Sequence, residues 1–282
     1  FVSTSTVIFD MHHSPENSLI LNYHDACIYD SDLQLIESRT EWLNDSCINF
    51  QLVRLYHQKR NKLRERMDDE EIRPVIFVDP SVVSYMMHQC DEEDLIDLGN
   101  SWRSELLEQN SSCKEAAVFL PVNDNNAAGT DAFRIPGGGN HWSMLVIILT
   151  AKHDDKFSYF SFDISLHFDS CNRSNAEAAK CVVAKASKVL NYSPKCCGVC
   201  SCPSPQQSNG YDCGIFALGV AEALSEKSLP ASSVGLGIMK YCEQELARFV
   251  EDNGGVKFAT NMRAKIASDI RTLAKEKTSK CS

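Results

Sequence analysis

The pattern of hydrophobic and polar positions predicts helices at both ends of the chain and strands between them. Near the beginning, apolar residues three and four positions apart predict a helix that is capped by Asp45, with Ile48, Leu52 and Leu55 on one face. The short run at 33–37 predicts a strand or turn instead. The spacing of apolar residues therefore predicts one helix that begins near Asp45, preceded by a short strand or turn.

Runs of apolar and β-branched residues predict strands at 75–78, 116–124, 141–150 and 156–163. Helices are predicted to begin at Pro80, capped by Asp79, and at Ser174, whose partner in a capping box is Glu177. Further helices are expected at 91–109, 213–225, 237–251 and 258–276. Residues 195–205 are expected to form a loop or a short edge strand. Helices, then strands, then helices again indicate an α+β fold.

The chain shows no linker that would divide it into several domains. Residues 1–18 have the composition of a loose extension, and no Pro/Ser-rich linker divides residues 19–282, which we expect to form one domain. The longest apolar run, 144–150, is far shorter than the roughly 18–20 residues of a membrane-spanning helix. No membrane association and no clear secretory signal are therefore predicted.

Charge and cysteine content narrow the class of protein further. A net charge of −10 argues against nucleic acid as the main partner, because no basic field attracts phosphates. The 13 cysteines are odd in number and lack a secretory context, which favours a reducing cytoplasmic or nuclear setting over a disulfide framework.

Two local motifs resemble a zinc site and a phosphate-binding loop, but each lacks residues that such a site requires. Cys197 and Cys200 have the spacing of zinc ligands, but Cys196 and Cys202 crowd the same loop and no second pair stands at a matching distance. Gly137–Gly139 is not followed by the Lys-Ser/Thr and helix of a phosphate loop. No metal and no organic cofactor are therefore expected.

Cys213 is the first candidate for chemistry. A thiol attacks a carbonyl as a thiolate, which the start of a helix and a neighbouring histidine both favour. Cys213 stands where the helix 213–225 begins, and Gly214 beside it leaves room for a substrate. An ordinary buried cysteine at a helix start is the alternative interpretation.

A nucleophilic cysteine needs a base and a group that orients the base. His141 ends a Gly-rich loop and begins the most apolar strand, which holds its ring and leaves it accessible. Asp163 and Asp169 both follow aromatic residues near the end of the next strand, and their spacing alone does not choose between them.

Five motifs make a family resemblance specific. They are "EWLNDSCINF", "FLPVNDN", "NHWSMLVI", "HFDSCNRSN" and "QQSNGYDCGIF", in this order over roughly residues 20–276. The chain resembles the Ulp/sentrin-specific cysteine proteases, which cleave ubiquitin-like modifiers, and within them the deneddylase (NEDD8-specific protease) branch. The resemblance implies a papain-like α+β fold with a central, mostly antiparallel sheet flanked by helices.

The resemblance also implies the catalytic roles. Cys213 becomes the nucleophile, His141 the general base and acid, Asp169 its orienting carboxylate and Gln207 the oxyanion-hole amide. Extra residues between the histidine strand and Asp169 depart from the family pattern, so Asp163 stays open as an alternative.

The substrate-binding residues implied by the resemblance surround the path of a Gly-Gly tail. Trp142 and Trp42 would form the walls of a narrow slot that excludes larger side chains. Asp45 would contact a basic tail, if it does not serve as a helix cap, and Asn123 and Asp124 would line the approach.

We therefore predict a monomeric thiol protease that cleaves after the Gly-Gly terminus of a ubiquitin-like modifier, with the neddylation modifier and its cullin conjugates as first partners. A sentrin/SUMO-type protease is the nearest alternative. An acyltransferase with a related His–acid–Cys core and a catalytically silent modifier-binding protein are the alternatives of other kinds.

Overall fold

A computed structural model of the chain describes residues 17–65, 73–109, 115–126, 139–153, 158–191, 198–227 and 236–281. Its main elements are β1 (Leu19–Tyr23), β2 (Ala26–Tyr29), α1 (Asp30–Glu37), α2 (Asp45–Glu65), β3 (Val75–Phe77), α3 (Pro80–His88), α4 (Glu92–Gln109), β4 (Glu115–Asn123), β5 (Trp142–His153), β6 (Ser158–Phe168), α5 (Ala176–Val189), β7 (Val199–Cys202), α6 (Cys213–Ser225), α7 (Leu236–Asp252) and α8 (Phe258–Cys281).

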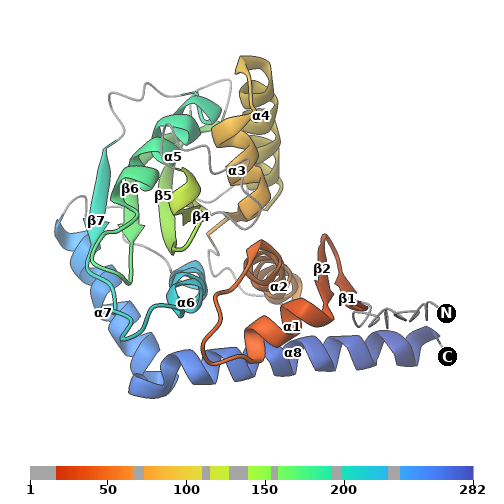
Figure 1. The fold of residues 1–282 in the computed structure, drawn as a ribbon. Coiled ribbons are helices and arrows are strands. Elements are labelled where there is room, and N and C mark those ends of the chain that lie inside the picture. The colour runs from red at the N-terminus through yellow and green to blue at the C-terminus, as the bar shows by residue number, and fades with distance from the viewer. Residues whose placement is uncertain are drawn as a thin grey trace, which may run out of the picture.

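Five of the strands form one mixed sheet in the order β3-β4-β5-β6-β7 (Figure 1). The three long central strands pair antiparallel, and the short edge strands β3 and β7 pair parallel with their neighbours. The predicted α+β fold with a mostly antiparallel sheet is confirmed. The run 195–205 contributes the edge strand β7.

Helices cover both faces of the sheet. Successive side chains of a strand point to opposite faces, so Met144 and Val146 of β5 pack with residues of α2 and α6, whereas Leu145 and Ile147 pack with residues of α3, α4 and α5. Figure 1 shows α3, α4 and α5 on one side of the sheet and α6 and α2 on the other. The helix that begins at Cys213 is therefore buried, and its residues are mostly small and apolar.

The last helix, α8, runs along the base of the molecule past α6, α2 and α1 (Figure 1). It contacts α1, β1 and α6, and its side chains Met262, Ile266 and Ile270 belong to the core. The C-terminal helix is thus an integral part of the layer that carries Cys213.

The strand or turn predicted at 33–37 is wrong, because these residues form the second half of helix α1. Asp32 accepts a hydrogen bond from the Tyr29 backbone N–H at 2.9 Å, which secures the first turn. Ile36 is completely buried. Tertiary packing therefore overrides a local pattern that resembles a strand.

Two predicted helix caps are also wrong. Asn44, not Asp45, caps α2, since its side-chain oxygen accepts the Cys47 backbone N–H at 3.0 Å. Helix α5 begins after Asn175 without a side-chain cap, so the Ser174–Glu177 capping box does not form.

The backbone conformation before α5 explains why this helix begins later than predicted. Asn172 and Arg173 have positive φ angles of 46° and 67°, and a hydrogen bond from Ser174 N–H to the Cys171 carbonyl closes a turn before the helix. By contrast, Asp79 caps α3 as predicted, accepting the Ser81 backbone N–H at 2.7 Å.

None of the described helices is both long and apolar enough to cross a lipid bilayer.

Candidate active site

His141 and Asp169 meet because β5 and β6 pair antiparallel. His141 directly precedes β5 and Asp169 directly follows β6, and Met144 stands opposite Phe168, so both polar residues lie at the same end of the sheet. His141 Nε2 lies 2.7 Å from Asp169 Oδ1, and both residues are buried. Asp163 is an exposed residue at a bulge inside β6. The sheet register therefore brings Asp169 to the imidazole.

The charge of this pair follows from its contacts. Burial alone lowers the pKa of His141, but hydrogen bonds to Asp169 and Cys213 outweigh it and raise the pKa to about 10. Burial raises the pKa of Asp169, yet the hydrogen bond from His141 and the backbone N–H groups of Asn175 and Cys171 hold this pKa below its usual value. At neutral pH the site holds an imidazolium beside a carboxylate, the arrangement that favours a thiolate nearby.

Cys213 is the first residue of α6, where the free backbone N–H groups of a helix favour negative charge. It is 1% exposed and its side chain is hydrogen-bonded to His141. A Cβ atom on Gly214 would lie 3.2 Å from the side chains of Leu43 and Ile48. This glycine lets α6 pack closely against Leu43 and against Ile48 of α2. Its expected role in making room for a substrate stays a prediction.

The polar loop before α6 is fixed by two glutamines. The side-chain oxygen of Gln207 accepts the Ser170 hydroxyl at 2.7 Å, and its amide donates to the Asn209 carbonyl at 2.6 Å. Gln206 instead donates to the backbone carbonyl of Asp169 at 3.0 Å. Both side chains thus tie this loop to the end of β6, and the amide of Gln207 is held in one orientation.

Trp42 and Trp142 are each anchored by the indole nitrogen. Trp142 donates to the Leu43 carbonyl at 2.9 Å, and Trp42 donates to the Gly210 carbonyl at 2.5 Å. The exposed fraction is 47% for Trp42 and only 6% for Trp142. Trp42 therefore offers an open indole face held against the loop that precedes Cys213.

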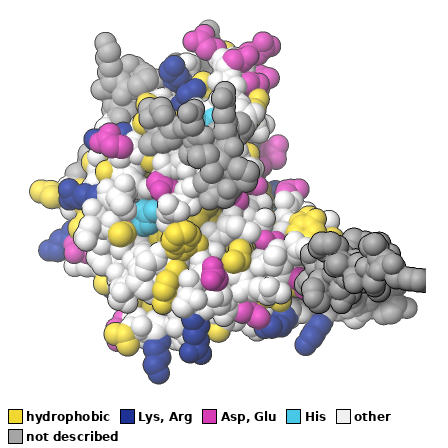
Figure 2. Space-filling view, viewed as in Figure 1, with side chains coloured by type: hydrophobic (Ala, Val, Ile, Leu, Met, Phe, Trp, Pro, Cys, Tyr) yellow, Lys and Arg dark blue, Asp and Glu magenta, His cyan; other side chains and the backbone are white. Residues whose placement is uncertain are grey.

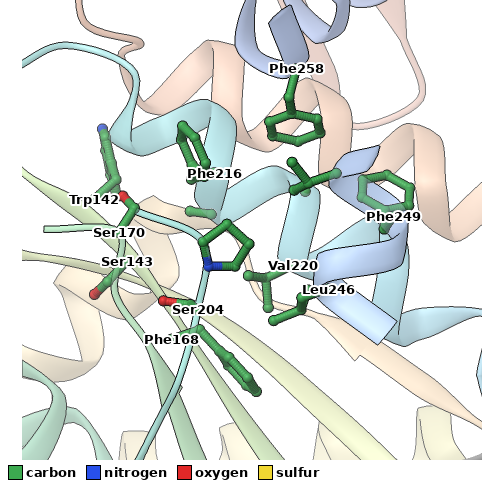
Figure 3. Close-up of a pocket in the computed structure, with 14 residues that line it drawn as sticks. Trp142, Ser143, Phe168, Ser170, Ser204, Phe216, Val220, Leu246, Phe249 and Phe258 are labelled. Carbon is green, nitrogen blue, oxygen red and sulfur yellow. The ribbon is translucent and has the colours of Figure 1, made fainter. Parts of the chain in front are cut away.

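The surroundings of Trp142 are apolar. Figure 3 shows it at one end of a cavity, with Phe216, Phe249 and Phe258 contributed by the surrounding helices. On the face seen in Figure 2, several hydrophobic side chains gather beside a histidine. Trp142 is therefore held among buried side chains, with only a small part of its surface exposed.

Asn123 and Asp124 hold the segment that leads into His141. Asp124 Oδ1 accepts the backbone N–H groups of Asn140 and His141 at 2.8 and 3.3 Å. Gly139 has a φ of 100°, and a Cβ atom there would lie 1.9 Å from Oδ1 of Asn123, so only glycine fits this turn. In this structure both residues position the histidine loop.

Asp45 lies at the first position of α2, directly after Asn44. Partial burial and the nearby charge of Asp79 raise its pKa. Because Asn44 provides the cap, the carboxylate of Asp45 is not required for helix termination.

Asn175 is a site residue that the sequence did not assign a role. It is 1% exposed, and its side-chain amide lies 3.0 Å from the His141 carbonyl and 3.1 Å from both the Val122 carbonyl and Ser143 Oγ. Its backbone N–H donates to Asp169 Oδ2 at 2.9 Å. The "RSN" of the quoted motif was its one visible signal.

His167 was missed as well. It is 1% exposed, and its Nε2 lies 2.9 Å from Ser143 Oγ. Burial lowers its pKa to about 4, although the charge of Asp169 acts in the opposite direction. A neutral imidazole therefore packs behind the charged pair, and its place inside a strand gave no signal in the sequence.

No group of three or more His, Cys, Asp or Glu side chains able to hold a metal ion occurs among the residues that the structure describes. Cys200 and Cys202 lie on β7, while Cys196 and Cys197 fall outside the described residues.

Comparison with known proteins supplies independent evidence. Residues 41–253 match the Ulp1 protease family, C-terminal catalytic domain. The chain is 31% identical over 214 residues to the probable sentrin-specific protease 8 of Dictyostelium discoideum, which covers 73% of this chain and 74% of that protein. It is 27% identical over 216 residues to NEDD8-specific protease 1 of Arabidopsis thaliana, which covers 77% of this chain and 79% of the relative.

A crystal structure of a de-sumoylating protease superposes with a TM-score of 0.57 over 94% of both chains, at 15% sequence identity. At this identity the similarity shows that the fold is shared.

Proposed function

Because the chain belongs to the Ulp1 protease family and is therefore a cysteine peptidase, we propose that it hydrolyses the bond after the C-terminal Gly-Gly of a ubiquitin-like modifier. The observation that carries the proposal is His141, whose Nε2 lies 2.7 Å from Asp169 and whose pKa is raised by both Asp169 and Cys213. This arrangement supplies a nucleophile, a proton carrier and an orienting carboxylate in one site.

The reaction follows from these positions. The Cys213 thiolate attacks the carbonyl carbon of the terminal glycine, and His141 gives its proton to the departing amine, which leaves a thioester. His141 then accepts a proton from a water molecule that hydrolyses the thioester and frees the thiolate. The same steps release a precursor extension or a lysine side chain.

The developing negative charge on the carbonyl oxygen needs donors. In our proposal these are the Gln207 side-chain amide and the backbone N–H of Cys213. Such donors typically contribute about 3 kcal/mol each to the transition state. The hydrogen bonds of Gln207 to Ser170 and Asn209 keep its amide in place before the substrate arrives.

The tail is proposed to pass beside Trp42, whose indole is open to solvent. Glycine has no side chain, so a slot closed by Trp42 and Trp142 selects two glycines by excluding anything larger. Asn123 pairs with Trp142 across the sheet and Asp124 accepts the His141 backbone N–H, and we propose that these two residues and Asp45 line the approach.

We further propose the neddylation modifier as the preferred substrate and its cullin conjugates as partners, with a sentrin/SUMO-type modifier as the alternative. The support is the relatives, one of which is named a NEDD8-specific protease. Residues 19–282 would act as one monomeric catalytic domain in the cytoplasm or nucleus.

The test is a competition among three modifier probes, of NEDD8, SUMO and ubiquitin type, each with a C-terminal propargylamide. We expect the NEDD8-type probe to form the covalent adduct first when all three are mixed at equal concentration. Faster reaction of the SUMO-type probe would support the alternative, and no adduct with any probe would contradict the proposed activity.

A further inference from the structure

Arg263 lies on α8, beyond the region 41–253 that matches the family, and yet it reaches the candidate active site. It is 4% exposed. A buried guanidinium is costly unless its donors are satisfied. The partners of Arg263 therefore show what this residue holds together.

The first partner is the residue before Cys213. Arg263 Nε and NH2 lie 2.9 and 2.8 Å from Asp212 Oδ1, and Asn209 donates to the other oxygen, Oδ2, at 2.8 Å. Arg263 also reaches the Tyr211 carbonyl at 3.4 Å. One side chain thus fixes the backbone from which the catalytic helix starts.

The other partners precede Trp42 in the chain. Arg263 NH1 donates to the Leu35 carbonyl at 2.9 Å, and NH2 donates to the Glu41 carbonyl at 2.8 Å. Glu41 directly precedes Trp42, whose indole nitrogen in turn bonds to Gly210. The guanidinium therefore links the end of α1, the Trp42 loop and the loop before Cys213.

Charge gives a second reason for this contact. A carboxylate that directly precedes the nucleophile would repel a thiolate if it were left unpaired. The guanidinium of Arg263 pairs with the Asp212 carboxylate at 2.8 Å, and both residues are buried. Asp212 thus keeps its hydrogen bonds to the loop without opposing the charge on Cys213.

We infer that Arg263 is a positioning residue that sets Cys213 and the Trp42 wall at a fixed separation. This inference rests on the proposed function, in which Cys213 is the nucleophile and Trp42 contacts the tail. The Asp212 contact serves the rate of the chemical step, and the carbonyl contacts serve the binding of the tail. The two contributions can be separated by substitution.

The experiment follows inactivation by the NEDD8-type propargylamide probe and resolves it into a binding constant and a maximal rate. Asp212→Asn keeps the shape of residue 212 and the carbonyl contacts of Arg263 but loses the charge-assisted bond that positions the loop before Cys213. We therefore expect a lower maximal rate with unchanged binding. Arg263→Lys keeps the charge but cannot span all the acceptors, so we expect weaker binding and a smaller loss in rate. Arg263→Met is expected to impair both, with a rate loss of roughly tenfold to a hundredfold.

Arg54→Lys is the matched control. Arg54 is a buried arginine that joins α2 to Asp269 of the same helix α8, at 2.9 Å and away from the loop before Cys213. The Arg54→Lys variant should have a lower thermal stability, but its folded molecules should keep the binding constant and the maximal rate of the wild-type protein. Alkylation of Cys213 by iodoacetamide, read by peptide mass spectrometry, supplies a rate that needs no modifier.

The outcomes are distinct. If the wild-type protein forms no adduct although iodoacetamide reaches Cys213, the proposed function fails. If the wild-type protein reacts and Arg263→Met reacts with the same two constants, the inference about Arg263 is overturned. Equal losses in Arg54→Lys would also overturn it, because the effect would then be one of general stability.

Discussion

Asp169 holds His141 at 2.7 Å while both of its own carboxylate oxygens are fixed by the backbone. The Cys171 N–H donates to Oδ1 at 2.8 Å and the Asn175 N–H donates to Oδ2 at 2.9 Å. The carboxylate cannot rotate without losing these bonds. The imidazole is therefore oriented by the turn that follows β6, and not by a free side chain.

Asp169→Asn is expected to shift the alkaline limit of activity to lower pH. His141 is charged below its pKa, which its hydrogen bonds raise to about 10 against the effect of burial. Removing the carboxylate leaves burial opposed by Cys213 alone, so the charged form is lost earlier as pH rises. A pH profile of kcat/KM tests this, and the rate at neutral pH should fall by about 10²–10⁴-fold.

An alkaline limit that stays in place in Asp169→Asn would contradict the role of this carboxylate. Asp163→Asn is the matched control, since Asp163 is exposed on β6 and should leave both the limit and the rate unchanged.

Substitutions of the two tryptophans should have different consequences. Trp42 is 47% exposed, so Trp42→Ala is expected to raise KM for the modifier with little effect on thermal stability. Trp142 is 6% exposed within an apolar cluster, and Trp142→Ala should cost about 3–5 kcal/mol of unfolding free energy. Steady-state kinetics and chemical denaturation of both variants check this, and equal effects on KM and stability would argue against separate roles.

Asn175→Ala should reduce both stability and rate. It removes the donor for the carbonyls of His141 and Val122, and a buried acceptor left without a partner costs about 1–3 kcal/mol. Because one of these carbonyls belongs to His141, kcat should fall further than the loss of folded protein explains.

The control is Glu177→Ala, two positions further along in the first turn of α5. Glu177 is exposed and pairs with the exposed Lys180, so this variant should match the wild-type protein in both measurements. A kcat of Asn175→Ala that equals the wild-type value per folded molecule would show that Asn175 is only structural.

His167 makes a contribution to acid sensitivity that can be isolated. Burial lowers its pKa from 6.5 to about 4, so the unfolded chain binds a proton between these values and the folded protein does not. Stability therefore falls as pH falls through this window, by about 3 kcal/mol in total. The unfolding free energies of the wild-type protein and His167→Gln, measured from pH 7 to about pH 4, should converge as the solution becomes more acidic. A constant difference would contradict this account.

The sequence predicted elements best where the signal was local. Asp79 and Pro80 set the start of α3 through a cap that needs no distant contact. The strand or turn predicted at 33–37 was wrong because the helix that forms there depends on burial of Ile36 in the core. The predicted start of α5 at Ser174 was wrong because Ser174 belongs to a turn in which two preceding residues have positive φ angles.

The candidate site shows the same division. His141, Asp169 and Cys213 stand at element ends within recognisable motifs, and the register of β5 with β6 brings the first two together. Arg263 carried no signal, because its role comes from acceptors as far away in the sequence as Leu35. Buried polar partners of this kind are defined by the folded structure alone.

The central claim is that Cys213 is the nucleophile of a modifier protease, and one measurement tests it most directly. The wild-type protein and Cys213→Ala are incubated with the NEDD8-type propargylamide probe, and the products are read by intact mass. The account predicts one covalent adduct on the wild-type protein and none on Cys213→Ala. An adduct of equal extent on Cys213→Ala, or tight binding of the modifier by the wild-type protein without adduct or turnover, would contradict it.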